Sequence, residues 1–156
     1  MKLLLARICC LIFVITILPA CKRSLQNKLS EAIENNCGKN PRKDCRIILA
    51  NVTDFKWDRV YLFGSWTTPD AISSKLGTGY DDDGTYDDTQ RLIFTRGSRI
   101  IYEEDINYLN GDKKIMFNIP DDSIFQRKRY YTSEQAVFNV ERGDDEFSKY
   151  TLSASR

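Results

Sequence analysis

The segment Asp54–Gly77, DFKWDRVYLFGSWTTPDAISSKLG, predicts a buried strand followed closely by a helix. From Val60 onward both alternating positions of the strand are apolar, which is typical of a central strand covered on both faces. Thr68 then supplies an N-cap, Pro69 a first helical residue and Gly77 a C-terminal stop. The segment therefore predicts a strand, a short loop and a helix that packs on a sheet.

The flanking sequence is mainly of the β type. An amphipathic helix is expected over 24–36, with Ser24 as its N-cap, and an acidic loop over 79–90. Gly97-Ser98 and Asn110-Gly111 are hairpin signals. Further strands are expected over 46–52, 91–95, 99–102, 106–108, 115–119, 124–131 and 136–141. The stretch 147–152 either adds a strand at a sheet edge or frays. We expect an α+β domain in which one or two short helices pack on one face of a mainly antiparallel β-sheet of about five to seven strands.

The N-terminus carries the layout of a secretory signal. Lys2 and Arg7 precede an apolar run, which ends in Leu18-Pro19-Ala20-Cys21. This tetrapeptide resembles the lipobox of bacterial lipoproteins. The resemblance implies that residues 1–20 are a cleaved signal peptide, that Cys21 is lipidated and that residues 21–156 form a single lipid-anchored periplasmic domain. Because Lys22 is not Asp, it also implies the outer membrane, facing the periplasm.

Two other interpretations of the N-terminus stay open. Ordinary secretion with cleavage after Ala20 would prefer a small residue where Leu18 stands. An uncleaved membrane helix needs about 20 apolar residues, whereas the unbroken run is shorter and Pro19 ends it. We therefore favour the lipoprotein.

Composition narrows the classes of function. The 156 residues include no histidine, which excludes Ser-His-Asp catalysis and His-ligated zinc. Without Lys2 and Arg7, 21 of the 23 basic residues remain against 22 acidic ones, a net charge of −1 that does not favour nucleic acid. The sequence also lacks a phosphate-binding glycine loop and a nucleophile elbow. We expect no enzyme, no cofactor, no metal and no nucleic-acid partner.

Cys37 and Cys45 are an even pair in a chain that we expect to be exported, which predicts a disulfide. Their spacing is not Cys-x-x-Cys, so the redox-active alternative is less favoured. A bridge of this loop size stabilises by roughly 2–3 kcal/mol in the chain-entropy description.

The segment 54–77 also carries a resemblance. Its Phe-Lys-Trp-Asp start, Thr-Thr-Pro helix opening and closing Leu-Gly are similar to a pattern in small bacterial envelope lipoproteins of unassigned function. The resemblance covers 24 residues and implies no catalytic residue.

Two groups of side chains are candidates for binding a partner. Trp66, Tyr80 and Tyr86 stand near loops, where exposed aromatics anchor protein interfaces; the alternative is packing over a sheet edge. Arg127 and Arg129 share one face of an expected strand and would contact phosphate headgroups, glycans or an acidic partner. The alternative for these arginines is an edge strand charged against aggregation.

Acidic side chains are the remaining candidates. The loop over 81–88 holds five aspartates, which could bind calcium, a basic partner or only water, but it lacks EF-hand spacing. Asp58, Glu103, Glu104 and Asp105 are the carboxylates available for hydrolysis, and nothing in the sequence places two of them at a catalytic separation.

Together these observations predict a lipid-anchored envelope protein that binds another macromolecule, a protein partner in the envelope. The sharpest version is an inhibitor or immunity protein against a periplasmic toxin or hydrolase. The alternative is a structural accessory subunit of an outer-membrane assembly complex.

Overall fold

The computed structural model describes residues 23–41, 44–85, 87–108, 115–119, 130–143 and 148–155. Within these ranges the chain forms two α-helices, eight strands and one short 3₁₀ turn, which confirms the expected α+β class. The elements are α2 (Leu25–Cys37), β1 (Arg46–Ile48), η1 (Leu49–Asn51), β2 (Arg59–Phe63), α3 (Pro69–Leu76), β3 (Thr89–Arg96), β4 (Arg99–Asn107), β5 (Ile115–Asn118), β6 (Tyr131–Thr132), β7 (Val137–Arg142) and β8 (Tyr150–Ala154).

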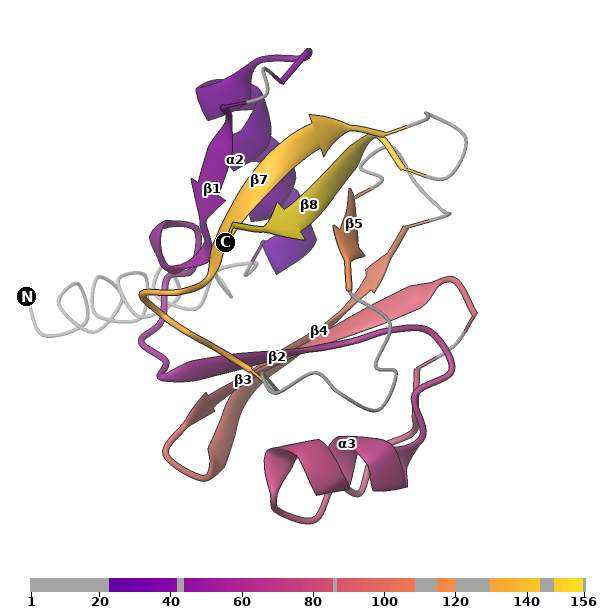
Figure 1. Cartoon of the computed structure of the whole chain (residues 1–156). Helices are drawn as coiled ribbons and strands as arrows, with labels where there is room; N and C mark the ends of the chain where they lie inside the picture. Colours follow the sequence, from indigo (N-terminus) through magenta and orange to yellow (C-terminus); the bar gives the residue numbers. More distant parts are fainter. Residues whose placement is uncertain are drawn as a thin grey trace, which may run out of the picture.

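The strands divide between two four-stranded sheets, where we expected one (Figure 1). The first has the order β1-β7-β8-β5 and the second β4-β3-β2-β6. All described pairings are antiparallel except that of β5 with β8. Hairpin signals indicate where the chain turns, but they do not tell which sheet the next strand joins.

Three predicted strand arrangements differ from the observed ones for this reason. The predicted hairpin between 106–108 and 115–119 is wrong, because β4 pairs with β3 whereas β5 lies parallel to β8 in the other sheet. Its expected turn at Asn110-Gly111 lies outside the described residues. The sequence also predicts that 124–131 pairs with 136–141 around a turn at 132–134. In the described residues β6 pairs with β2 instead, and β7 pairs with β1 and β8. The expected C-terminal edge strand is an interior one, since β8 lies between β7 and β5.

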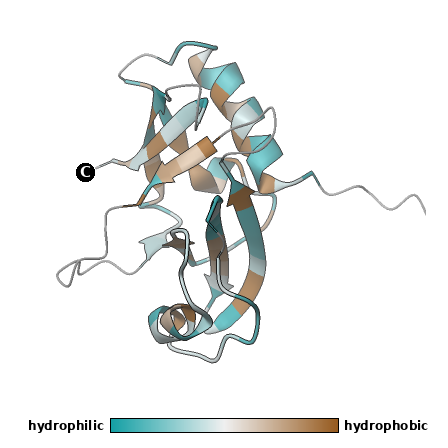
Figure 2. Ribbon diagram, turned by 90° about the vertical axis from the view of Figure 1, so that its right-hand side faces the viewer, coloured by the Kyte–Doolittle hydropathy of each residue, from teal (hydrophilic) through white to brown (hydrophobic). Residues whose placement is uncertain are grey.

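Helix α2 begins as the sequence predicts. The Ser24 side chain accepts a hydrogen bond from the Asn27 backbone N–H at 3.2 Å, which satisfies one free donor of the first turn. Leu25, Leu29 and Ile33 recur at helical spacing and are buried, while the rest of the helix is mostly hydrophilic (Figure 2). The apolar stripe of α2 thus faces the interior.

The main core lies where α2 and the two sheets meet. Phe117 of β5 and Phe138 of β7 meet edge to face in it, with ring centroids 5.2 Å apart. From the second sheet, alternate residues of β2 and β3 point into the same core. Its fully buried members include Leu29, Ile33, Leu49, Val60, Leu92, Phe94, Ile106, Ala136 and Leu152.

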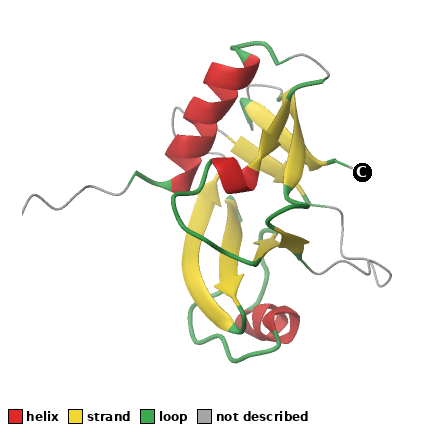
Figure 3. Cartoon of the chain, turned by 90° about the vertical axis from the view of Figure 1, so that its left-hand side faces the viewer, coloured by secondary structure: helices red, strands yellow, loops and turns green. Residues whose placement is uncertain are grey.

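A second, smaller core lies on the opposite face of the β4-β3-β2-β6 sheet, under α3. Thr68 caps α3 through a hydrogen bond from Ala71 N–H at 3.3 Å, and Gly77 ends it at φ 73°. Figure 3 shows α2 and α3 at opposite ends of the molecule. Because β2 sends residues to both cores, the predicted strand with two buried faces is confirmed. The smaller core consists of Tyr61, Phe63, Ile72, Tyr80 and Ile93.

The disulfide joins the last residue of α2 to the residue before β1. Cys37 and Cys45 are bonded, with Cα atoms 5.6 Å apart, a usual separation for this bond. The predicted disulfide is therefore present and ties the helix to the edge of the first sheet.

Candidate partner-binding site

Trp66 stands in the turn between β2 and α3, and 69% of its surface is exposed. Its backbone adopts φ 61°, and it is the only residue other than glycine with a positive φ among those the structure describes. A bulky side chain is an outlier in this region, because its Cβ crowds the following carbonyl. Such conformations persist only where the surroundings enforce them.

Hydrogen bonds from the acidic loop enforce the conformation of this turn. The side chains of Thr67 and Thr85 both donate to the Gly64 carbonyl, at 2.7 and 2.5 Å. The backbone of Thr67 donates to the Thr85 hydroxyl at 2.7 Å, and Thr85 N–H donates back to the Thr67 carbonyl at 3.0 Å. A Cβ on Gly84 would overlap the Thr67 carbonyl, so only glycine allows this close approach.

A second set of contacts holds the other side of the turn. The Ser65 hydroxyl lies 2.9 Å from the Tyr108 hydroxyl, which donates to the Asp87 carbonyl at 2.8 Å. The Trp66 indole N–H donates to the Asp87 carboxylate at 3.0 Å. The turn is thus braced from two directions, and the Trp66 ring is held by one edge while most of its surface stays open.

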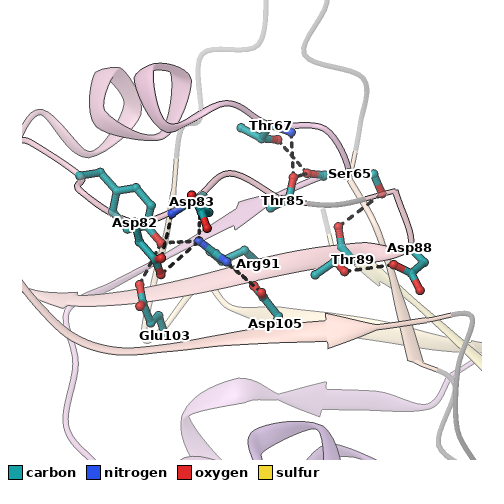
Figure 4. A network of polar contacts seen from close by, with 12 residues as sticks. Ser65, Thr67, Asp82, Asp83, Thr85, Asp88, Thr89, Arg91, Glu103 and Asp105 are labelled. Atoms are coloured by element: carbon teal, nitrogen blue, oxygen red, sulfur yellow. Dashed lines mark hydrogen bonds and ion pairs between the residues drawn. The ribbon is translucent and has the colours of Figure 1, made fainter.

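The acidic loop continues over the sheet and is fixed there by Arg91 (Figure 4). The Arg91 side chain is only 7% exposed and binds Asp105 through two nitrogens, at 2.6 and 2.8 Å. A third nitrogen donates to the Tyr80 hydroxyl and the Asp83 carbonyl, both at 2.6 Å. The hydrogen bonds with Asp105 raise the pKa of Arg91 above its ordinary value. The buried charge is therefore paired, as burial requires.

Tyr80 belongs to the same network. Its hydroxyl donates to Glu103 at 3.1 Å and accepts from Arg91, and only 8% of the residue is exposed. Burial is the main reason why the pKa of Tyr80 rises to about 12. This burial leaves little of Tyr80 for a partner to contact.

An open pocket of about 190 Å³ lies beside this network, lined by Asp82, Arg91, Glu103, Glu104 and Asp105. Asp82 is 55% exposed at its side chain and lies 3.6 Å from Arg91. Of the four carboxylates that line the pocket, Glu104 binds the first turn of α2 on the other face of the sheet, so Arg91 faces the remaining three. Its short hydrogen bonds go to only one of these, Asp105. The pocket carries an excess of negative charge.

The candidate residues of the sequence fall into three groups. Trp66 is exposed, Tyr80 is buried, and Tyr86, Arg127, Arg129 and Cys21 lie outside the described residues. The carboxylates considered for hydrolysis hold other parts of the fold together. Asp58 accepts from the Gly97 N–H at 2.7 Å, and Glu104 accepts from the first turn of α2.

No pattern in the sequence predicts the residues that brace the Trp66 turn. Ser65, Thr67, Thr85 and Tyr108 are ordinary loop residues until the fold brings their three segments together. For Arg91 the sequence contains one indication of an ion pair, because carboxylates follow on the neighbouring strand of the predicted 97–98 hairpin.

Comparison with known proteins gives no matching family model, no matching curated protein and no matching solved structure. In the described part of the chain, no group of three or more Cys, Asp or Glu side chains is arranged to hold a metal ion. Nor does any helix in those ranges have the length and apolarity needed to cross a membrane.

Proposed function

We propose that this chain is a lipid-anchored envelope protein that binds another protein through the Trp66 surface, defined as Trp66 with the exposed aspartates Asp81, Asp82, Asp83 and Asp87 of the acidic loop. Its sharpest form is an inhibitor or immunity protein against a periplasmic toxin or hydrolase. The observation that carries the proposal is the exposed Trp66 ring on a braced turn.

The energetics of this turn support a binding role. A left-handed backbone costs a residue with a side chain about 1–2 kcal/mol, a cost that glycine would avoid. Among the described residues the Trp66 side chain makes one hydrogen bond, to Asp87, and the ring is mostly open to solvent. Exposed tryptophans on rigid supports are frequent hot spots of protein interfaces, because ordering them costs little entropy. A partner that covers the ring would remove its apolar surface from water, which folding of the chain alone does not do.

The position of α2 supports a partner in the envelope. The backbone N–H groups of Leu25 and Gln26 donate to the Glu104 carboxylate of β4, at 2.7 and 2.8 Å, and fix the start of the helix. Three residue steps separate Cys21 from Ser24, which span at most about 11 Å. Lipid on Cys21 would therefore hold the domain beside the membrane.

Site-specific cross-linking tests this function. A photo-reactive amino acid replaces Asp81, an exposed residue of the Trp66 surface, in the full-length, membrane-anchored chain. A matched variant carries it at Ile48, which is 42% exposed on β1. We expect one dominant protein to be cross-linked from position 81 and not from position 48, and Trp66→Ala should abolish the cross-link from position 81. Mass spectrometry identifies the partner and measures the acylation of Cys21.

Each outcome of this experiment decides one part of the proposal. A toxin or hydrolase supports an inhibitor, whereas a resident assembly complex supports the accessory subunit instead. Equal labelling from both positions rejects the Trp66 surface. An N-terminus without acyl groups rejects the lipid anchor.

A further inference from the structure

The Trp66 surface is strongly acidic for a chain of nearly balanced charge. Between Gly64 and Gln90 the sequence has six acidic residues and one basic residue, Lys75. Four of the loop aspartates, Asp81, Asp82, Asp83 and Asp87, are exposed. A surface of this sign attracts a positively charged partner and slows the approach of a negative one.

The pocket gives this attraction a definite place. Arg91 uses its bidentate pair on Asp105, and the 3.6 Å separation leaves Asp82 only loosely engaged. Glu103 accepts its hydrogen bond from the hydroxyl of Tyr80, which is neutral at ordinary pH. A cation that entered the pocket would therefore meet two carboxylates that Arg91 does not neutralise at close range.

Trp66 adds a second requirement for the partner. Asp87 holds the indole by its N–H, so the aromatic face stays available while a carboxylate stands at its edge. Guanidinium and ammonium groups stack on tryptophan faces and pair with carboxylates, arginine more often than lysine. An anionic lipid headgroup satisfies neither requirement.

We infer that the partner presents a basic protein segment to this surface, with an arginine or lysine side chain in the pocket of Asp82 and Glu103 and a second side chain against the Trp66 ring. This inference rests on the proposed function and specifies the chemistry of the partner. The partner contributes cations, and the present chain supplies carboxylates and one aromatic anchor.

Selection from a random peptide library tests the inference. The probe peptides are selected on the full chain in detergent micelles, with the Trp66→Ala chain used to remove peptides that bind elsewhere. We expect the selected peptides to be arginine-rich. Replacement of their arginines by neutral citrulline should weaken binding by about thirtyfold or more, the size of a hot-spot effect. Added salt should weaken binding as well.

Variants of the chain locate the contact. Asp82→Asn and Glu103→Gln should each weaken binding of a selected peptide by about two- to fivefold, as expected for partly exposed ion pairs. Glu141→Gln is the matched control, because it removes the same charge from an exposed position on β7 of the other sheet. Its affinity should not change.

The results separate this inference from the proposed function. Trp66-dependent peptides that are neutral or acidic overturn the basic partner and leave the protein-binding function standing. Equal effects of Glu141→Gln and Asp82→Asn overturn the pocket as the contact. Trp66-dependent sedimentation with phosphatidylethanolamine–phosphatidylglycerol vesicles, in place of peptide binding, overturns both and assigns the surface to lipid.

Discussion

The side chain of Gln90 pairs with the backbone of Phe117 as a neighbouring strand would. Its amide nitrogen donates to the Phe117 carbonyl and its amide oxygen accepts from the Phe117 N–H, both at 2.7 Å. Gln90 belongs to β3 and Phe117 to β5, so one buried side chain joins the two sheets. It also satisfies the N–H and carbonyl groups of Phe117, which face away from β8 at the edge of the first sheet.

Replacement of Gln90 by leucine should therefore destabilise the domain. The apolar side chain fits a similar volume but leaves one buried donor and one buried acceptor without partners, at about 1–3 kcal/mol for each group. We expect the free energy of unfolding to fall by roughly 2–6 kcal/mol in urea titrations. Gln135→Leu, at an exposed turn, is the control and should change it by less than about 0.5 kcal/mol. Equal effects of the two replacements would show that the Gln90 pair adds no stability.

A single β-bulge explains why the sequence predicts the hairpin but not its charge pairs. Counted outward from the turn, Arg96 faces Arg99, and an uninterrupted ladder would bring Arg91 opposite Glu104. The register shifts after Thr95, so that Arg91 faces Asp105 instead. The shift sends Asp105 to the α3 face and Glu104 to the α2 face, since a slip of one residue exchanges the two faces of a strand. Neither composition nor periodicity contains this shift.

The two aromatic candidates show that the sequence alone does not predict which site residues are exposed. Trp66 and Tyr80 both stand in loops, and their local sequences favour exposure equally. Arg91 and Glu103 come from two neighbouring strands and bind the Tyr80 hydroxyl, which draws that residue inward. The described part of the chain offers Trp66 no buried partner, because its N–H bonds to the exposed Asp87, and the ring stays exposed. Helix caps at Ser24 and Thr68 depend on three or four adjacent residues, and these were predicted correctly.

Glu104 provides the negative charge that the first turn of α2 lacks in its own sequence. Its carboxylate accepts from the N–H groups of Leu25 and Gln26 and from the Tyr102 hydroxyl. Glu104→Ala should lower the free energy of unfolding by about 2–3 kcal/mol, because hydrogen bonds to charged groups are lost. Glu104→Gln keeps one acceptor and should lose less. The measurement is urea unfolding beside Glu141→Ala; similar losses in both alanine variants would contradict a capping role.

Alkaline pH should destabilise the protein through Tyr80. Burial raises the pKa of Tyr80 from its ordinary value of 10 to about 12 in the folded state. The neutral hydroxyl is therefore favoured by folding, and this contribution is complete below pH 10 and disappears as the pH rises through 12. We expect wild type to lose part of its stability advantage over Tyr80→Phe between these values. The check is urea unfolding of both proteins across this range, and a constant difference between them would contradict the assignment.

The backbone of Trp66 predicts that two substitutions at this position differ in stability but not in binding. At φ 61° a glycine avoids the Cβ crowding that alanine keeps, so Trp66→Gly should be more stable than Trp66→Ala by about 1 kcal/mol. Asn35, exposed in α2, is the control position, and there glycine should be less stable than alanine by a similar amount. Both Trp66 variants lose the indole, so both should fail to bind the partner. Urea unfolding gives the order of stability, and cross-linking from position 81 gives the binding. If Trp66→Gly were no more stable than Trp66→Ala, the turn would not be strained. The exposure of Trp66 would then be the only observation that supports it as the partner contact.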